Sequence, residues 1–263
     1  MRASDVIYRA TAWLRHNFTA RNTLGHGIHS PYLYNMVRFL IYDDNSYYCF
    51  SQIERERRRL LSASNQLYIT DFGSGVSGSR RVCDAASSSL MPARDAQMLF
   101  RIVNHLHPQI VVELGTSLGI TTSYLSVAAG SKSMVYTFEG SRSLLAEAET
   151  VWRNLHCGNI TPQEGNIDVT LEQFLRLHPR VDFALIDANH RYEPTLRYFD
   201  LLSERSCRSS IIAMDDIHYS VEMGKAWEQV KRHPRVVATM DFYGMGLVFF
   251  DRRFLPKHYI MRY

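Results

Sequence analysis

From residue 109 onward, short apolar runs alternate with amphipathic stretches of helical periodicity. This alternation predicts a parallel sheet covered by helices on both faces. The expected parallel strands are Ile110–Val112, Met134–Phe138, Asn159–Pro162, Val181–Ile186 and Ser210–Met214. Val236–Met240 and Leu247–Phe250 follow with a connection too short for a helix, which predicts a closing antiparallel hairpin. The expected fold class is therefore α/β, a doubly wound, seven-stranded, mostly parallel sheet.

Residues 1–92 have helical rather than alternating patterns. Val6, Ala10, Trp13 and Leu14 fall on one face of a first helix, with Ser4 as its candidate N-cap. Ser30-Pro31 opens a second helix with an apolar face (Leu33, Met36, Val37 and Leu40), and a third covers Gln52–Leu61. These faces need a surface that buries them. We therefore expect residues 1–92 to form a helical cap over part of the ligand site at the edge of the sheet, and residues 93–263 to form the α/β domain that carries this site.

The turn after the first strand predicts a ligand site. Glu113 ends the strand, and Gly115, Thr116, Ser117 and Gly119 lead into a helix. Glycines let the backbone approach a ligand, and the helix presents free N–H groups. The spacing Glu-x-Gly-x-x-x-Gly differs from the Gly-x-Gly-x-x-Gly that binds a pyrophosphate, so it favours a nucleotide-like ligand without one.

The second and third strands extend this site. Glu139-Gly140 ends the second strand, where a carboxylate can accept hydrogen bonds from both hydroxyls of a ribose. Gly165-Asn166-Ile167 follows the third strand at the same edge.

Two polar clusters follow the fourth and fifth strands: Asp187-Ala-Asn-His190 and Asp215-Asp216-Ile-His218. Ligands of an open α/β sheet bind beyond the carboxyl ends of its strands, so both clusters are expected at that edge. Three carboxylates there (Asp187, Asp215 and Asp216) favour a hard divalent cation such as magnesium. The alternative is that Asp215 and Asp216 cap the next helix while Asp187 binds the amino group of the cofactor.

Composition narrows the class of protein. A net charge of +4 on 263 residues does not indicate a nucleic-acid partner. The four cysteines lack Cys-x-x-Cys spacing, which favours buried free thiols in a reducing cytoplasm. No secretory signal is visible, and no run approaches the ~20 apolar residues of a membrane span. We expect a cytoplasmic protein that does not cross a membrane.

Taken in order, these motifs resemble class I S-adenosylmethionine-dependent methyltransferases over residues ~93–252, a Rossmann-like fold. More narrowly, they resemble the O-methyltransferase branch that includes catechol, caffeoyl-CoA and macrolide-sugar enzymes. The resemblance implies S-adenosylmethionine as the cofactor, a small hydroxylated acceptor and a possible homodimer. It implies magnesium at Asp187, Asp215 and Asp216, although this chain has Asp-Asp where catechol-type enzymes have Asp-Asn. His190 stands where those enzymes place a lysine base.

Several alternatives stay open. The acceptor hydroxyl loses its proton either to His190 or under the influence of a metal. The chain could instead methylate a protein or RNA, or act as a non-catalytic cofactor-binding module, whereas the glycine spacing argues against a nicotinamide dehydrogenase. A second glycine-rich segment, Asp71–Gly78, resembles a cofactor turn but lacks a following strand that ends on an acid. His26 and His29 are more typical of loop residues than of metal ligands.

Overall fold

The computed structural model describes residues 3–70 and 77–263. These residues divide into two compact units, one spanning Asp44–Leu177 and the other combining Met1–Asp43 with His178–Tyr263. The expected boundary at residue 92, between a helical cap and an α/β domain, stays a prediction.

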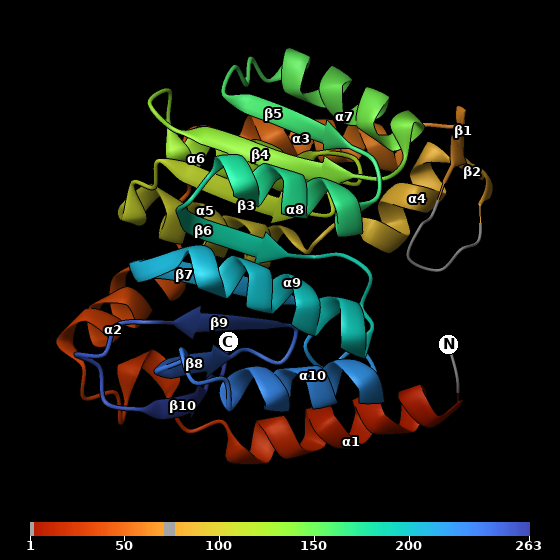
Figure 1. The fold of residues 1–263 in the computed structure, drawn as a ribbon. Coiled ribbons are helices and arrows are strands. Elements are labelled where there is room, and N and C mark those ends of the chain that lie inside the picture. The colour runs from red at the N-terminus through yellow and green to blue at the C-terminus, as the bar shows by residue number, and fades with distance from the viewer. Residues whose placement is uncertain (1–2, 71–76) are drawn as a thin grey trace. The chain divides into compact units, whose positions relative to one another are not determined.

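Three parallel strands form the sheet of the Asp44–Leu177 unit (Figure 1). They are β3 (Ile110–Leu114), β4 (Met134–Glu139) and β5 (Ile160–Glu164), with β4 in the centre. Glu113 lies opposite Thr137, and Glu139 lies opposite Glu164. Because the strands are parallel, their carboxyl ends share one edge, where the predicted cofactor residues lie.

The described residues of this unit also form six helices, which lie between and before the strands. They are α3 (Phe50–Leu61), α4 (Val82–Ser89), α5 (Ala93–Leu106), α6 (Ile120–Ala129), α7 (Arg142–Asn154) and α8 (Ile167–Leu177). Helix α3 packs against α6, since the Tyr124 hydroxyl donates a 2.8 Å hydrogen bond to Glu54 and the rings of Phe50 and Tyr124 lie 5.5 Å apart. Part of the N-terminal segment therefore covers this unit's own helices.

A small antiparallel hairpin, β1 (Gln66–Ile69) and β2 (Gly78–Arg81), stands apart from the parallel strands. It lies against the start of α7, because the Thr70 amide donates to Ser141 Oγ (3.2 Å) and Ser143 Oγ donates to the Tyr68 carbonyl (2.6 Å). The predicted strand at Leu67–Thr70 thus exists, but outside the main sheet. Most of the second glycine-rich segment, residues 71–76, lies outside the described residues.

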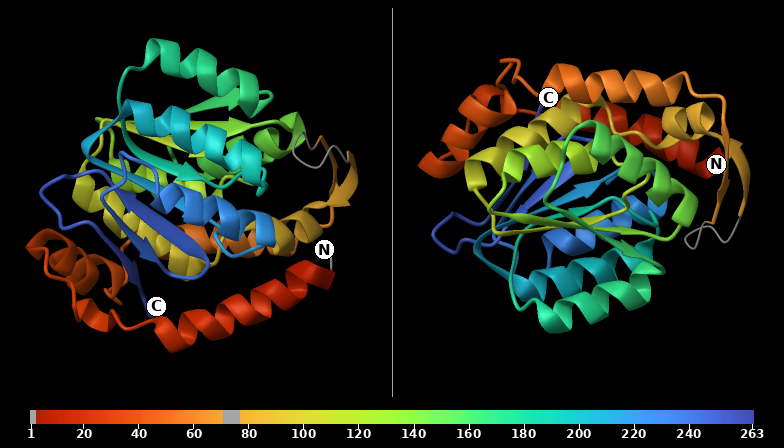
Figure 2. Two further views of the ribbon diagram at one scale, coloured as in Figure 1. Left: turned by 60° about the horizontal axis from the view of Figure 1, so that its bottom comes forward. Right: turned by 90° about the horizontal axis from the view of Figure 1, so that it is seen from above.

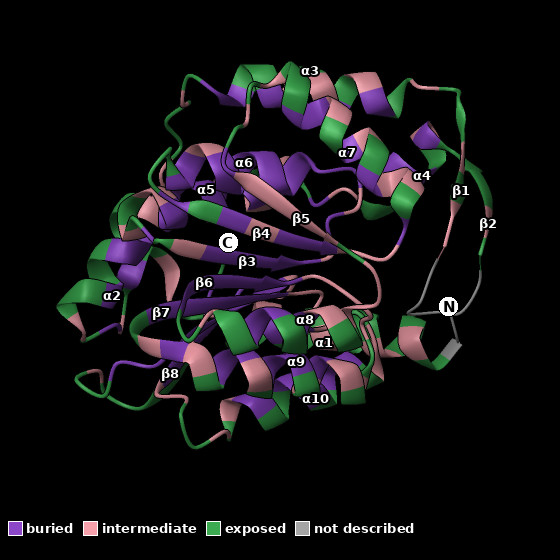
Figure 3. Ribbon diagram, turned by 45° about the horizontal axis from the view of Figure 1, so that its top comes forward, coloured by how far each residue is buried: buried purple, intermediate pink, exposed green. Residues whose placement is uncertain are grey.

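The other unit contains five strands in the order β10-β8-β9-β7-β6. They are β6 (Val181–Ile186), β7 (Ser206–Asp215), β8 (Ala238–Asp241), β9 (Met245–Phe249) and β10 (Lys257–Ile260). Strands β6 and β7 are parallel, whereas β9 is antiparallel to both β7 and β8. The closing hairpin is confirmed, but β10, which pairs parallel with β8, was not expected and adds an eighth strand, among the described residues, to the seven that were predicted. Both β3 and β6 are buried along most of their length (Figure 3).

The remaining helices of this unit are α1 (Ala3–Thr19), α2 (Pro31–Met36), α9 (Tyr192–Arg205) and α10 (Val221–Lys231), with short turns at Thr23–Gly25 and Val37–Ile41. Ser30 caps α2 as predicted, since its Oγ accepts the Leu33 amide at 3.4 Å. The prediction for the first helix was wrong in one respect, because Ser4 lies inside α1 rather than before it. Val6, Trp13 and Leu14 are 49, 53 and 49% exposed, so the described residues of this chain do not supply the surface expected to bury them.

Helix α1 runs beside α10 in two views of the molecule (Figures 1 and 2). Gly224 of α10 makes the approach possible, because a Cβ there would overlap the Tyr8 hydroxyl. The helix is thus positioned by small and polar groups and not by its apolar face.

None of the described helices is long and apolar enough to cross a membrane. All four cysteines are free, but only Cys49 is buried, so the prediction of buried thiols was wrong for Cys83, Cys157 and Cys207.

The hairpin of β8 and β9 depends on a glycine. A Cβ on Gly246 would lie 2.6 Å from the ring of Trp227, which is fully buried and cannot move away. We expect Gly246→Ala to lower the free energy of unfolding by about 1–3 kcal/mol, the range for overpacking a core. Gly244→Ala is the matched control, because a Cβ there meets nothing within 4 Å. Urea unfolding of both variants measures the effect, and equal losses would contradict the packing argument.

Candidate functional site

Glu113 lies at the end of β3 and is fully buried. Its Oε2 accepts hydrogen bonds from Thr122 Oγ1 (2.5 Å) and Thr137 Oγ1 (2.6 Å), whereas its Oε1 has no hydrogen-bond partner among the described residues. Burial raises the pKa of Glu113 to about 7, partly opposed by these two hydrogen bonds, and nearby Glu139 raises it further. A buried oxygen without a donor suits a cationic or N–H group of a ligand.

Glu139, at the end of β4, binds the turn that follows β3. Its Oε2 accepts the backbone amide of Ser117, and its Oε1 accepts that of Ser141, both at 2.8 Å. A carboxylate oxygen can accept more than one hydrogen bond, so these contacts orient Glu139 without exhausting it. Of the predicted cofactor residues, the structure thus brings Ser117 and Glu139 into direct contact.

The turn itself holds three residues with positive φ: Gly115 (101°), Ser117 (50°) and Gly119 (75°). Gly119 has no room for a side chain, since a Cβ would lie 2.6 Å from Trp152 Nε1 and 2.7 Å from Ala148 Cβ. The Trp152 indole N–H also donates a 3.0 Å hydrogen bond to the Gly119 carbonyl. Trp152 is therefore a buried core residue, and it also fixes the start of α6.

The other predicted cofactor residues support the same edge. Thr116 is buried, and its hydroxyl lies 2.6 Å from that of Thr137. Gly140 follows Glu139 and is half-buried. Gly165 has a φ of 129° and donates its amide to the Glu139 carbonyl (2.9 Å). Asn166 Oδ1 accepts the amide of Asp168 at 3.0 Å, which places Asn166 at the start of α8, and Ile167 is its first residue.

In the other unit, His190 lies between two of the predicted acids. Its Nε2 is 3.6 Å from Asp187 Oδ1, and its Nδ1 is 4.0 Å from Asp216 Oδ2. Desolvation lowers the pKa of His190, and the negative charge of Asp216 opposes that effect. The imidazole is therefore neutral near pH 7 and able to accept a proton, with 31% of its side chain exposed.

The backbone of this cluster is strained. Asn189, His190 and Asp216 have φ of 70°, 38° and 55°. Side chains other than glycine rarely adopt this region, and such residues concentrate at functional sites. The observation supports a functional role for both clusters.

The three carboxylates predicted to hold a metal do not gather closely. Among residues 3–70 and 77–263, one group of three potential ligands has its atoms within 4.8 Å of one another, and it is His16, His218 and Asp241. Asp187, Asp215 and Asp216 do not form such a group, so we derive no step through a metal at those residues. Sequence reasoning missed the His16 group, because His16 lies more than 200 residues before His218 and Asp241 and no local motif connects them.

The remaining candidates are dispersed. His26 and His29 are exposed. The Tyr219 ring lies 5.9 Å from that of His190, and Met223 is buried in the core. Phe242 and Gly246, in the hairpin of β8 and β9, are buried.

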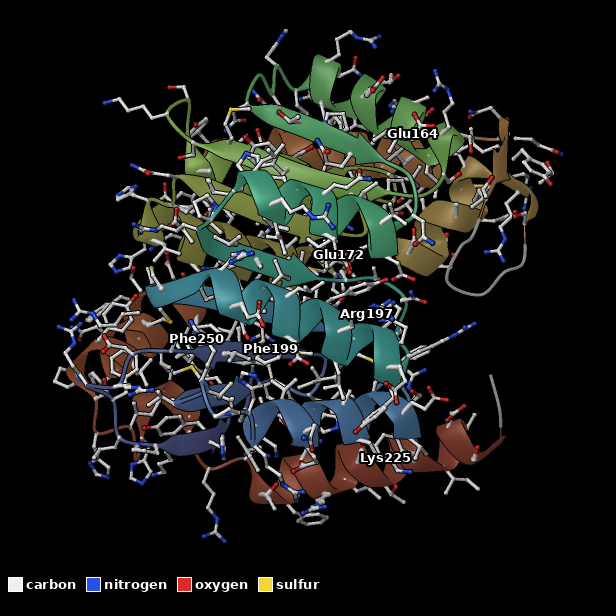
Figure 4. The ribbon with its side chains drawn as sticks, viewed as in Figure 1. Glu164, Glu172, Arg197, Phe199, Lys225 and Phe250 are labelled. Atoms are coloured by element: carbon white, nitrogen blue, oxygen red, sulfur yellow. The ribbon has the colours of Figure 1, made fainter. Side chains whose placement is uncertain are left out.

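A groove of about 450 Å³ between α9 and α10 is lined by residues such as Phe199, Val230 and His233, and Figure 4 labels Phe199 on α9. None of the predicted site residues lines it.

Part of the chain matches a known protein family. Residues 112–217 match a family model described as a methyltransferase domain, which covers the turn after β3, Glu139 and both acidic clusters. A search of curated proteins finds no match.

Solved structures with a similar fold include a putative O-methyltransferase from Klebsiella pneumoniae, at 14% identity and a TM-score of 0.57 over 79% of this chain and 92% of that one. An O-methyltransferase from Bacillus cereus in complex with SAH has 15% identity and a TM-score of 0.55, over 79% of this chain and 93% of that one. TomG from Streptomyces achromogenes, an O-methyltransferase involved in tomaymycin synthesis and bound to SAM, has 12% identity and a TM-score of 0.56, over 82% and 95%. At these identities the similarity establishes the fold, and the predicted fold class is confirmed.

Gly119→Ala tests the packing of the turn on Trp152. Gly158→Ala is the control, because a Cβ there meets nothing within 4 Å and its φ is not positive. At position 119, alanine costs about 1–2 kcal/mol for the left-handed backbone and about 1–3 kcal/mol more because Trp152 and Ala148 must move. We therefore expect Gly119→Ala to lose about 2–5 kcal/mol relative to Gly158→Ala in denaturant unfolding. Equal stability of the two variants would show that the turn tolerates a side chain.

Glu113 predicts a pH dependence of stability. Its pKa rises from 4.5 to about 7 on folding, so between these values the folded protein keeps a proton that the unfolded chain has lost. The contribution of Glu113 to stability therefore falls as pH rises from about 4.5 to 7, by at most roughly 3.5 kcal/mol at about 1.4 kcal/mol per pH unit. Urea unfolding at pH 5 and pH 7.5 should show this loss in the wild type and not in Glu113→Gln. Parallel pH profiles would contradict the buried acid.

Proposed function

We propose that this chain, which carries a methyltransferase domain over residues 112–217, is an S-adenosylmethionine-dependent O-methyltransferase for a small hydroxylated acceptor. The observation that carries the proposal is the turn after β3, which lies between a buried carboxylate, Glu113, and an oriented one, Glu139. This arrangement offers two acidic groups and a helix N-terminus to a ligand that bears a ribose and an amino acid.

The residues of the turn fit S-adenosylmethionine. Glu139 can accept hydrogen bonds from the ribose hydroxyls while it holds the Ser117 and Ser141 amides. Glu113 Oε1 is the buried oxygen that lacks a partner among the described residues, and it suits the ammonium group. The amides at the start of α6 suit the carboxylate. Gly165, Asn166 and Ile167 are the residues we assign to the adenine side.

S-adenosylmethionine supplies a methyl group on a positively charged sulfur, and its transfer forms a C–O bond on the acceptor as the C–S bond breaks. The acceptor hydroxyl must lose its proton as this bond forms. His190 is the base we assign, because burial keeps its imidazole neutral at physiological pH. Once it holds the proton, the carboxylates of Asp187 and Asp216 stabilise its positive charge from 3.6 and 4.0 Å.

We therefore assign to Asp187 the role of stabilising the protonated His190. Its further roles in binding the cofactor or magnesium, together with Asp215 and Asp216, stay predictions. The small acceptor is supported by relatives of the same fold, one of which is named as acting in tomaymycin synthesis.

The homodimer stays a prediction as well. The exposed apolar residues Ile7, Trp13 and Phe18 on α1 are the surface that a second copy would cover.

The experiment separates cofactor binding from catalysis. Glu139→Ala should weaken S-adenosylmethionine binding in calorimetry by roughly 1.5–3 kcal/mol, the range for hydrogen bonds that involve a charged group. His190→Gln should bind the cofactor normally and transfer methyl groups to a panel of catechols and other small hydroxylated compounds about 10²–10⁴-fold more slowly. His233→Gln is the matched control, since His233 also lies near a carboxylate, Asp200, at 3.7 Å.

Three outcomes would overturn the proposal: wild-type cofactor affinity in Glu139→Ala, preferential binding of NAD, or unchanged methyl transfer in His190→Gln. The same assay, run with magnesium and again after exhaustive chelation, tests the metal. Full activity after chelation would show that no metal is required and that His190 acts as the base without one.

A further inference from the structure

His16 is unusual within α1. It is the one buried side chain among residues 4–19, whereas the large apolar residues Ile7 and Phe18 of the same helix are 65 and 81% exposed. A helix that leaves its apolar residues in solvent is not held by hydrophobic burial. The position of α1 therefore depends on the polar contacts of His16 and of Tyr8.

His16 meets a carboxylate and a second histidine. His16 Nδ1 lies 3.3 Å from Asp241 Oδ1, and His218 Nε2 lies 2.9 Å from Asp241 Oδ2. The three ligand atoms all lie within 4.8 Å of one another. They come from α1, from the segment after β7 and from the end of β8, so three separate parts of one unit converge there.

The outer nitrogens of both imidazoles are occupied by oxygens. His16 Nε2 lies 2.9 Å from the Met261 carbonyl, which can only accept, so this nitrogen carries a proton. His218 Nδ1 lies 3.3 Å from the Tyr8 hydroxyl. A histidine that binds a metal through one nitrogen usually donates the other N–H to an oxygen of this kind. Both rings thus have the orientation of metal ligands.

The Asp241 carboxylate is also held from outside the cluster. Its Oδ1 accepts the amide of Tyr243 at 2.8 Å, and its Oδ2 accepts the indole N–H of Trp227 at 3.1 Å. These two bonds fix the carboxylate so that each of its oxygens faces one imidazole nitrogen. In the neutral tautomer that carries its proton on Nε2, His16 offers the lone pair of Nδ1 to a cation.

We propose that His16, His218 and Asp241 bind a divalent transition-metal cation of the zinc type. Two imidazoles and one carboxylate are a common ligand set for zinc, with bonds of about 2.0–2.2 Å. Ligand atoms at that radius around a tetrahedral ion stand about 3.3 Å apart, which is within the 4.8 Å that separates the three potential ligand atoms when no ion is bound. Imidazole ligands favour zinc over magnesium, which prefers oxygen. This site is separate from Asp187, Asp215 and Asp216, and it does not depend on the function proposed above.

The proposed ion joins α1 to the β8–β9 hairpin. His16 is the only ligand that α1 contributes, and Asp241 is the last residue of β8. The ion would therefore determine whether residues 3–19 stay docked, and its effect would be structural.

The test uses the full-length protein after dialysis against a chelator. Zinc chloride is titrated into the wild type, His16→Gln and Asp241→Asn, with binding followed by calorimetry and cobalt used as a spectroscopic substitute. We expect one zinc per chain that is lost in both ligand variants. Tyr8→Phe keeps all three ligands but removes the oxygen beside His218, and it should weaken zinc binding by about 10–100-fold. His233→Gln, which changes a histidine of the same unit outside the cluster, should bind zinc like the wild type.

Circular dichroism of each variant shows whether it is folded, and the cobalt spectrum reports directly on imidazole coordination in those that are. A zinc stoichiometry in His16→Gln equal to that of the wild type would overturn the proposal, because any zinc would then bind elsewhere. The absence of zinc binding to the folded wild type would also overturn it, and would leave a doubly protonated His16 paired with Asp241 as the explanation.

Discussion

The burial of the Glu113 carboxylate at the end of β3 is the constraint on which the turn after it depends. A carboxylate without water needs donors, and Thr122 and Thr137 provide them from the next helix and the next strand. These bonds fix the start of α6 relative to β4. Glu139 then holds the turn from β4 through the Ser117 amide. The positive φ values of the turn persist because these contacts define its path.

In the other unit, polar contacts define the position of a helix rather than the path of a turn. Helix α1 has too little buried apolar surface to define its own position, so directed polar contacts take that role. Such contacts are specific in geometry but sensitive to charge, in contrast to the packing of β6 and β7. The two ways of holding an element in place coexist within one compact unit.

Much of the fold could be predicted because the strands are long apolar runs that alternate with amphipathic helices. Val181–Ile186 was predicted with the bounds that the structure shows. The carboxylates at the strand ends were placed by the same logic, since parallel strands bring their carboxyl ends to one edge. The contact between Ser117 and Glu139 follows from that arrangement.

The features that were missed depend on contacts between distant residues. Strand β10 has only four residues and two of them, Lys257 and His258, are exposed, so no periodicity marks it. The exposure of Trp13 and Leu14 could not be read from a helical pattern, because the pattern shows a face and not what covers it. His16 pairs with Asp241 although the two residues are 225 positions apart in the sequence. They meet because the order of the strands in the sheet places the end of β8 beside α1.

The three tryptophans occupy three distinct settings, which gives the molecule intrinsic optical labels. The Trp152 indole is bonded to the Gly119 carbonyl in the turn, and the Trp227 indole is bonded to Asp241 in the histidine cluster. Trp13 is 53% exposed on α1 and emits as a solvated indole. With Trp13 replaced by phenylalanine, the remaining fluorescence divides between the two sites. One emitter then senses the cofactor turn and the other the Asp241 carboxylate, without any added dye.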